Sequence, residues 1–103
     1  MKKITLALMV AMAACTGSKQ VAMTQTDADR ASAKFPGATL ASLNEGKKHY
    51  EENCGKCHGL KAVTWGNERQ WLEIIPPMAE KAAISEDTQL LITQYLVTAC
   101  EVK

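Results

Sequence analysis

The sequence lacks a surplus of charge, a long apolar run and an alternating pattern. Twelve basic residues stand against eleven acidic ones among 103, and phosphate binding requires a clear basic surplus, so we expect no nucleic-acid partner. The longest apolar run, residues 4–14, has eleven residues, whereas a helix needs about 20 to cross a bilayer. No segment alternates apolar and polar residues as a half-buried strand does, and no repeat is found. These absences favour a small helical protein.

The first fourteen residues have the layout of a secretory signal peptide. Lys2 and Lys3 precede the apolar run, and Ala13 and Ala14 place small residues before a cleavage point. We therefore leave residues 1–14 out of the fold and expect an exported protein, with an ordinary N-terminal helix as the alternative. Without the two lysines, ten basic residues remain against eleven acidic ones, a net charge of −1.

The stretch MAAC at 12–15 resembles the lipobox of bacterial lipoproteins, although Met12 stands where leucine is usual. In such proteins the cysteine becomes the lipidated first residue of the mature chain. The resemblance implies that acyl chains on Cys15 anchor the protein on the periplasmic side of a membrane. Thr16, in place of aspartate, favours the outer membrane. Cleavage nearby that leaves a free thiol is the alternative.

Residues 15–41 are predicted to form a flexible linker. They are rich in Ser, Thr, Ala, Gly, Gln and Asp and show little apolar periodicity, and Phe35-Pro36-Gly37 is a turn signal. A random coil of this length reaches roughly 25–30 Å and would let an anchored domain swing between partners. The alternative is that the part from about Phe35 packs on the following domain.

The domain, residues 42–103, is predicted to contain about three short helices. The first begins at Ser42, where Glu45 completes a capping box. The second begins at Asn67 and ends before Pro76-Pro77, and the third begins at Ser85. The apolar faces expected on the first and third helices consist of Leu43, Gly46, Tyr50 and Cys54, and of Leu91, Ile92, Tyr95, Leu96 and Ala99.

A body of this size is too small to be comfortably stable on its own helices. Domains with about 62 residues usually contain a disulfide, a metal or another cross-link. Residues 53–59 read NCGKCHG, which places Cys54, Cys57 and His58 in a Cys-x-x-Cys-His motif. We expect a group bound at this motif to supply the missing part of the core.

Four chemistries use paired cysteines at this spacing. A redox dithiol favours a thioredoxin-like βαβ context, which the helical pattern does not offer. A structural zinc needs four ligands, and beyond the motif the candidates are His49, Cys100 and Cys15. A disulfide within the motif would leave its histidine unexplained. Covalent haem uses all three residues, as two thioethers and an imidazole ligand of iron, and is attached outside the cytoplasm, in agreement with export.

Over about residues 42–99 the chain resembles the class I c-type cytochromes in their short single-haem form. GKKHYEENCGKCHG resembles the N-terminal helix and haem-binding site of that family, and LITQYLVTA resembles its C-terminal helix. In the family, a small residue and an aromatic residue on the first helix cross an aliphatic and an aromatic residue on the last. The matching residues are Gly46, Tyr50, Ile92 and Tyr95. The resemblance implies an all-α, cytochrome c-like fold around one covalent haem c.

The resemblance also implies a methionine thioether on the iron opposite His58. Met78 is the one methionine after the motif, 20 residues beyond that histidine, a shorter spacing than in many relatives. Trp71 matches a family tryptophan that packs on the haem or bonds a propionate, and Trp65 could form another wall. The proline that usually follows the haem histidine is missing from GLKAVTWGN, so the carbonyl that orients His58 is not identified. Ordinary core packing is the alternative for Met78 and both tryptophans.

His/Met ligation leaves no open position for a substrate, so the expected function is one-electron transfer and not catalysis. The carrier would pass electrons between redox proteins at a membrane surface and would have no small-molecule substrate. Lysines around the motif would steer an acidic partner or form a solvated face: Lys47, Lys48, Lys56 and Lys61.

Two other functions stay open. An open sixth position would give a haem enzyme or a gas or peroxide sensor, and zinc or a disulfide would give an interaction module. Cys100 is expected to be a buried, inert thiol, with an intermolecular disulfide as the minor alternative.

Overall fold

The computed structural model describes residues 21–54 and 59–102, and this part of the chain is helical without strands. The all-α prediction is confirmed, with one helix more than expected. None of the described helices is both long and apolar enough to cross a membrane. The elements are α1 (Gln25–Lys34), α2 (Leu40–Asn53), the 3-10 turn η1 (Val63–Trp65), α3 (Glu68–Ala82) and α4 (Glu86–Ala99).

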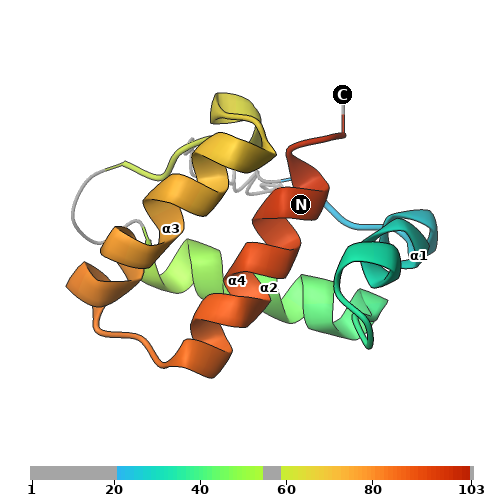
Figure 1. Ribbon diagram of the computed structural model, residues 1–103, viewed down its shortest axis with the longest axis horizontal. Coiled ribbons are helices and arrows are strands. Elements are labelled where there is room, and N and C mark those ends of the chain that lie inside the picture. The colour runs from blue at the N-terminus through green and yellow to red at the C-terminus, as the bar shows by residue number, and fades with distance from the viewer. Residues whose placement is uncertain (1–20, 55–58, 103) are drawn as a thin grey trace, which may run out of the picture.

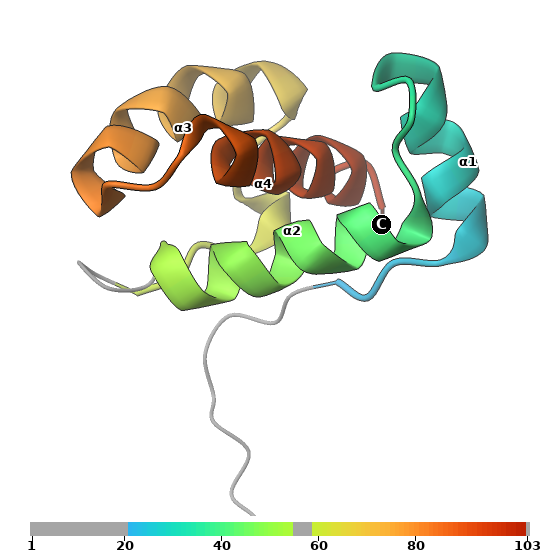
Figure 2. The same cartoon turned by 90° about the horizontal axis from the view of Figure 1, so that it is seen from below.

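Helix α4 is the centre of the fold. It packs most extensively on α2, next on α3, and also contacts α1 and η1. Figure 1 shows α3 and α4 side by side with α1 at one end of the molecule. In the view from below, α2 forms one layer beneath α3 and α4 (Figure 2). The largest fully buried side chains come from all these layers and are Trp71, Tyr50, Tyr95, Leu43, Ile92, Leu96, Val63 and Val97.

The crossing of α2 and α4 requires a glycine. A Cβ atom at Gly46 would lie 2.0 Å from the carbonyl oxygen of Leu91 and 3.0 Å from Cβ of Tyr95. No other residue lets the two backbones approach so closely. Tyr50 packs one turn further along, with its ring centroid 6.3 Å from that of Tyr95. The expected crossing is therefore present, but its backbone contact falls on Leu91 instead of Ile92.

Helix α2 begins earlier than predicted. Its N-cap is Thr39, whose side chain accepts from the Ser42 amide at 3.1 Å, while the Ser42 hydroxyl accepts from the Thr39 amide at 2.8 Å. The predicted capping box of Ser42 with Glu45 is therefore wrong. The earlier start adds a helical turn in which the Leu43 amide donates to the Thr39 carbonyl, and this turn carries the Leu43 side chain into the core at 0% exposure.

The caps predicted for the other two helices are confirmed. The Asn67 side chain accepts from the Gln70 amide at 2.9 Å at the start of α3. The Ser85 hydroxyl accepts from the Thr88 amide at 3.1 Å at the start of α4. The apolar face predicted for α4 is buried except for Leu91, which is half-buried.

The prediction that α3 ends before Pro76-Pro77 is wrong. The helix continues to Ala82 through both prolines, although each lacks the amide that an interior helical position donates. A row of buried side chains begins before the prolines and continues after them, and its burial favours a continuous helix. Its members are Trp71, Ile75 and Ala79. The prolines themselves are exposed.

The structure differs most from the sequence prediction in residues 21–41, which were expected to belong to a flexible linker. Thr24 caps α1 through a capping box with Asp27, and the side chains of Ala28 and Ala31 are each 2% exposed. Alanine methyl groups give only a weak apolar signal, so the sequence pattern did not reveal this buried face. This part of the predicted linker, including the segment before Phe35, is folded.

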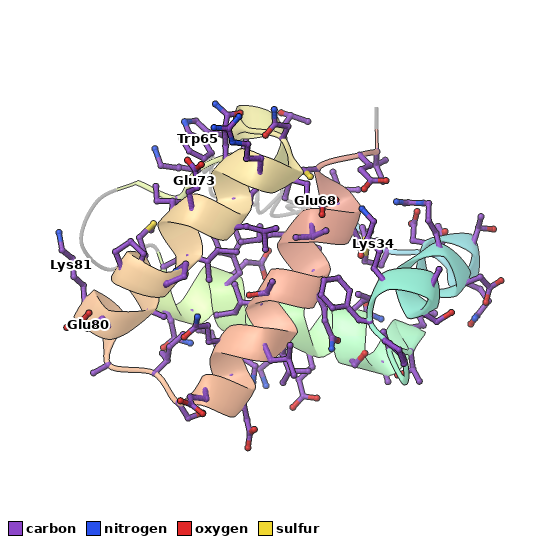
Figure 3. The ribbon with its side chains drawn as sticks, in the orientation of Figure 1. Lys34, Trp65, Glu68, Glu73, Glu80 and Lys81 are labelled. Carbon is purple, nitrogen blue, oxygen red and sulfur yellow. The ribbon has the colours of Figure 1, made fainter. Side chains whose placement is uncertain are left out.

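Ion pairs link α1 to the first residue of α3 and to Glu101, two residues after the end of α4. Arg30 lies 3.1 Å from a carboxylate oxygen of Glu101, and Lys34 lies 2.9 Å from the other. Lys34 also pairs with Glu68 at the start of α3 (Figure 3). The hydrogen bond from Lys34 holds the pKa of Glu101 below its usual range. These groups are well exposed, so each pair contributes little alone.

Replacement of Gly46 by alanine should force α2 and α4 apart. The methyl group has no space beside the Leu91 carbonyl, so we expect the free energy of unfolding to fall by at least about 2 kcal/mol. Denaturant unfolding followed by circular dichroism measures this change. Gly59→Ala is the control because a Cβ there meets nothing within 4 Å. Equal stability of the two variants would contradict the close crossing.

Replacement of Pro76 by alanine should stabilise α3. The new amide can donate within the helix, and alanine is favoured over proline at interior positions by about 3 kcal/mol. Part of this gain is offset because the unfolded chain becomes freer, so we expect a net gain of about 1–3 kcal/mol in unfolding free energy. Pro36→Ala, in the turn after α1, is the matched control and should give no gain. A loss of stability in Pro76→Ala would argue against a continuous helix.

Candidate functional site

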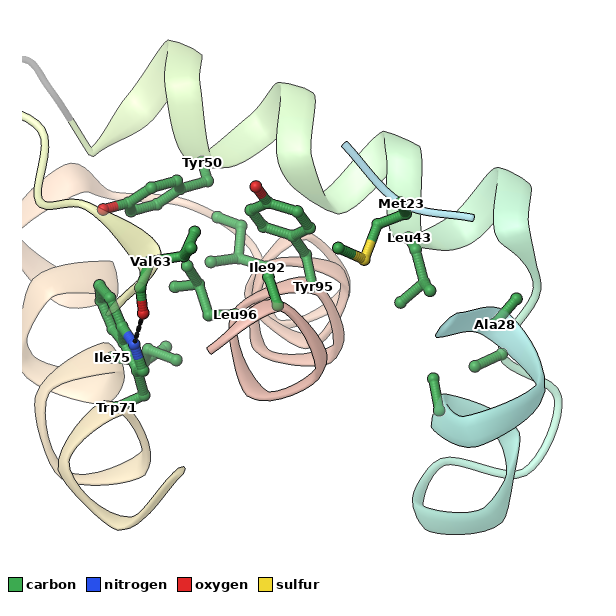
Figure 4. Packing of buried hydrophobic residues seen from close by; sticks show 13 residues of the cluster. Met23, Ala28, Leu43, Tyr50, Val63, Trp71, Ile75, Ile92, Tyr95 and Leu96 are labelled. Atoms are coloured by element: carbon green, nitrogen blue, oxygen red, sulfur yellow. Dashed lines mark hydrogen bonds between the residues drawn. The ribbon is translucent and has the colours of Figure 1, made fainter. Parts of the chain in front are cut away.

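An apolar pocket lies where the end of α2 faces the middle of α3. It includes Cys54, Trp71 and Met78, three of the residues that the sequence analysis assigned to the cofactor. Figure 4 shows several of its walls, with Tyr50 above Trp71 and Ile75 and with Ile92 and Leu96 beside them. The full lining is Tyr50, Cys54, Trp71, Ile75, Met78, Ala79, Ile84, Ile92 and Leu96. No lining residue carries a formal charge.

Cys54 is the C-cap of α2 and brings the first sulfur of the motif to the pocket. Its amide donates to the Tyr50 carbonyl at 3.0 Å, and its side chain is half-buried. Burial raises the pKa of the thiol, and the negative end of the helix dipole also disfavours a thiolate. A redox dithiol needs a lowered pKa at its attacking cysteine, so Cys54 is poorly suited to that role.

Met78 lies on α3 immediately after the two prolines. The two prolines predicted that Met78 follows the end of a helix, but it lies within α3, half-buried and lining the pocket. Its thioether is a soft, neutral donor of the kind that binds haem iron. The structure therefore brings Met78 to the same pocket as Cys54.

Trp71 forms a wall of the pocket and is 1% exposed. Its Nε1 donates to the carbonyl oxygen of Val63 at 2.9 Å, shown as the dashed line in Figure 4. Indole has a single donor, so Trp71 has none left for a propionate in this arrangement. Of the two roles implied by the resemblance, only packing against a cofactor is compatible with this hydrogen bond.

Trp65 lies outside the pocket, contrary to the expectation that it could form a wall. It is 43% exposed and stacks edgewise on the outer side of Trp71 with ring centroids 5.1 Å apart. The Lys61 ammonium lies 4.6 Å from its ring centroid. Figure 3 shows Trp65 at the edge of the molecule near the start of α3.

Several predicted site residues fall outside the described part of the chain. These are Cys15, Lys56, Cys57 and His58. His49 is described, and its Nε2 lies 3.8 Å from a carboxylate oxygen of Glu45, away from the pocket lining. Among residues 21–54 and 59–102, no group of three or more His, Cys, Asp or Glu side chains could hold a metal ion.

Cys100 is half-buried at the end of α4, and burial raises the pKa of its thiol. Its Sγ donates to the Val97 carbonyl at 3.3 Å. The environment agrees with the inert thiol that the sequence analysis favoured.

The pocket suits haem in its chemistry but is small. Apolar walls, one thiol and one thioether match the groups that a covalently bound haem uses. The cavity has a volume of only about 10 Å³, which is room for about one water molecule, far below the roughly 300–1,000 Å³ of typical cofactor pockets. A porphyrin would therefore require α3 to move outward or would lie mostly outside the pocket.

Six residues of the lining were not assigned to the site from the sequence. Tyr50 and Ile92 were expected only at the helix crossing, and Leu96 only in the core. Ile75 and Ala79 follow Trp71 at intervals of four residues, so helical periodicity through the prolines would have identified them. Ile84 lies in the turn before α4, where periodicity gives no signal.

No family model, curated protein or solved structure significantly matches this chain. The motif and the pocket are therefore the features from which a function can be inferred.

Cys54 should react slowly with iodoacetamide in protein without haem. Because burial raises its pKa, less thiolate is present at mildly alkaline pH than in the unfolded chain. The rate should rise with pH, and the difference between folded and unfolded protein should narrow as pH passes the folded pKa. Timed alkylation with peptide mass spectrometry measures the rate, with guanidinium-unfolded protein as the reference. A faster reaction in the folded protein would indicate an activated thiol instead.

Proposed function

We propose that this chain is a one-electron carrier with one covalent haem c, attached through Cys54 and Cys57 and ligated by His58 and Met78. The observation that carries this proposal is the shared apolar pocket of Cys54 and Met78. One is the first residue of the Cys-x-x-Cys-His motif, and the other is the one methionine after it. Their place in one pocket supports haem, because Cys54 would supply a sulfur for covalent attachment and Met78 would supply a sulfur ligand for iron.

The haem would supply an iron that cycles between the ferric and ferrous states. The Met78 thioether is a neutral donor, which favours the ferrous state and raises the reduction potential. The uncharged lining of the pocket acts in the same direction, because burial without nearby counter-charges disfavours the more positive ferric centre. Cys54, at the fixed end of α2, would hold one edge of the porphyrin.

Electron transfer is favoured over catalysis because two protein ligands would leave the iron no position for a substrate. If Met78 did not bind, the iron would be open, and the protein would be a haem enzyme or a sensor of gas or peroxide. The raised pKa of Cys54 argues against a redox dithiol. A zinc or disulfide interaction module is the remaining alternative.

We further propose export and a lipid anchor at Cys15, with redox proteins as partners on the periplasmic side of a membrane. Folded structure begins close to this cysteine, because the Val21 carbonyl accepts from the Tyr95 hydroxyl at 2.8 Å. The six residue steps from Cys15 to Val21 span at most about 20 Å. Such a carrier would work nearer to the membrane surface than the predicted linker of about 26 residues would allow.

Expression of the full chain in a host with haem-attachment machinery tests this proposal. Intact mass should show one haem and the acyl groups, and the reduced protein should have the sharp α band of low-spin haem c. Met78→Leu should abolish the far-red absorption of a ferric thioether complex, lower the reduction potential and allow CO to bind. Optical spectra and redox titration measure these changes.

Met23→Leu is the matched control, because Met23 is a buried methionine outside the pocket lining. It should retain the wild-type spectrum. A secreted product without porphyrin would overturn the proposal, and zinc in its place would favour the interaction module. CO binding by the wild-type protein would favour the enzyme or sensor.

A further inference from the structure

Tyr50 contacts the chain on both sides of the motif. Its carbonyl accepts from the Cys54 amide at 3.0 Å, at the end of α2. Its side-chain hydroxyl donates to the carbonyl of Lys61, three residues after His58. The Tyr50 side chain is 1% exposed, and burial raises its pKa. The hydroxyl therefore keeps its proton, and remains a donor, at physiological pH.

Trp71 makes a second side-chain hydrogen bond to the segment 61–65, which follows the motif. Its Nε1 donates to the Val63 carbonyl at 2.9 Å, two residues beyond the carbonyl held by Tyr50. The rings of Tyr50 and Trp71 meet edge to face with centroids 5.9 Å apart. Two buried donors, one from α2 and one from α3, thus bind neighbouring carbonyls of one short segment.

The segment 61–65 is also fixed by its own contacts. The Val63 side chain is 1% exposed, and the Trp65 amide donates to the Ala62 carbonyl at 2.9 Å within η1. The stretch between the motif and η1 contains Gly59 and no proline, so its sequence supplies little backbone restraint. The two ring donors add to the restraint that the contacts of Val63 and η1 provide.

We propose that Tyr50 and Trp71 are positioning residues for the candidate haem site. By fixing the Lys61 and Val63 carbonyls, they tie residues 61–65 to both α2 and α3, and so set how the end of α2, with Cys54, faces the part of α3 that carries Met78. This role rests on the proposed function, because it concerns the positions of two residues that are proposed to hold the haem.

Tyr50→Phe tests the proposal by removing only the hydroxyl. Tyr95→Phe is a matched control, since Tyr95 is equally buried and donates its hydroxyl to the Val21 carbonyl at 2.8 Å, outside the pocket lining. In the mature exported protein, the Trp65 amide should exchange its hydrogen at least about tenfold faster in Tyr50→Phe than in Tyr95→Phe. Hydrogen-exchange mass spectrometry or NMR measures this rate.

A second readout separates positioning from stability alone. In the haem-loaded protein, Tyr50→Phe should weaken the far-red thioether absorption and shift the reduction potential, whereas Tyr95→Phe should leave both unchanged. If Tyr50→Phe does not fold, Trp71→Phe removes the other donor and is measured in the same way.

The outcomes distinguish this inference from the proposed function. Unchanged exchange at Trp65 in Tyr50→Phe would overturn the positioning role even if the protein carries haem. Faster exchange with an unchanged spectrum and potential would also overturn it, because the hydrogen bond would then be structural only. A wild-type protein that binds no haem would overturn the proposed function, while the exchange measurement would still report whether Tyr50 holds the segment.

Discussion

The close contact of α2 with α4 at Gly46 determines where the candidate site lies. No side chain fits between the glycine Cα and the Leu91 carbonyl, so the register and the distance of the two helices are fixed there. Tyr50 follows after about one turn and Cys54 after about two, roughly 12 Å along the axis. The crossing thus places the end of α2, with the first cysteine of the motif, opposite α3. On the other side, α4 supplies Ile92 and Leu96 to the same pocket.

Sequence patterns predicted the features that local chemistry determines. Asn67 and Ser85 were identifiable as caps because each is a short polar residue before an amphipathic run. Cys54 and Met78 were assigned from a motif and from the scarcity of alternative sulfur donors, and both line the pocket. In each case the relevant information lies within a few neighbouring residues or in the residue type itself.

The features that sequence patterns did not predict depend on tertiary contacts. The buried residues of helix α1 are alanines. Its Lys34 pairs with Glu68 on α3 and with Glu101 in the C-terminal segment, contacts that no local pattern indicates. Pro76-Pro77 would end an isolated helix. In the folded protein α3 continues, because Ile75 before the prolines and Ala79 after them are both buried on the same face. The Tyr50 hydroxyl donates to the backbone carbonyl of Lys61. Every residue has such a carbonyl, so the sequence does not indicate which one Tyr50 binds. Such contacts can be found only once the helices are placed.

The two sides of the pocket differ in how firmly their backbones are held. On the side of Cys54, α2 is fixed by its crossing with α4, and the Tyr50 hydroxyl binds the Lys61 carbonyl on the far side of the motif. On the side of Met78, α3 lacks two interior amide donors and ends at Ala83, an alanine in the left-handed region with φ of 56°.

That left-handed conformation is costly for alanine, so the second half of α3 has fewer favourable backbone interactions than the end of α2. The pocket is smaller than a typical cofactor pocket, and a porphyrin would have to displace one wall. Displacement of α3 would leave the α2–α4 crossing intact and would shift only the half-helix that carries the methionine. If the proposed haem binds, this division would place the permanent thioether bond of Cys54 on the firmly held side. The weaker bond from the Met78 sulfur to iron would then lie on the side with fewer backbone restraints.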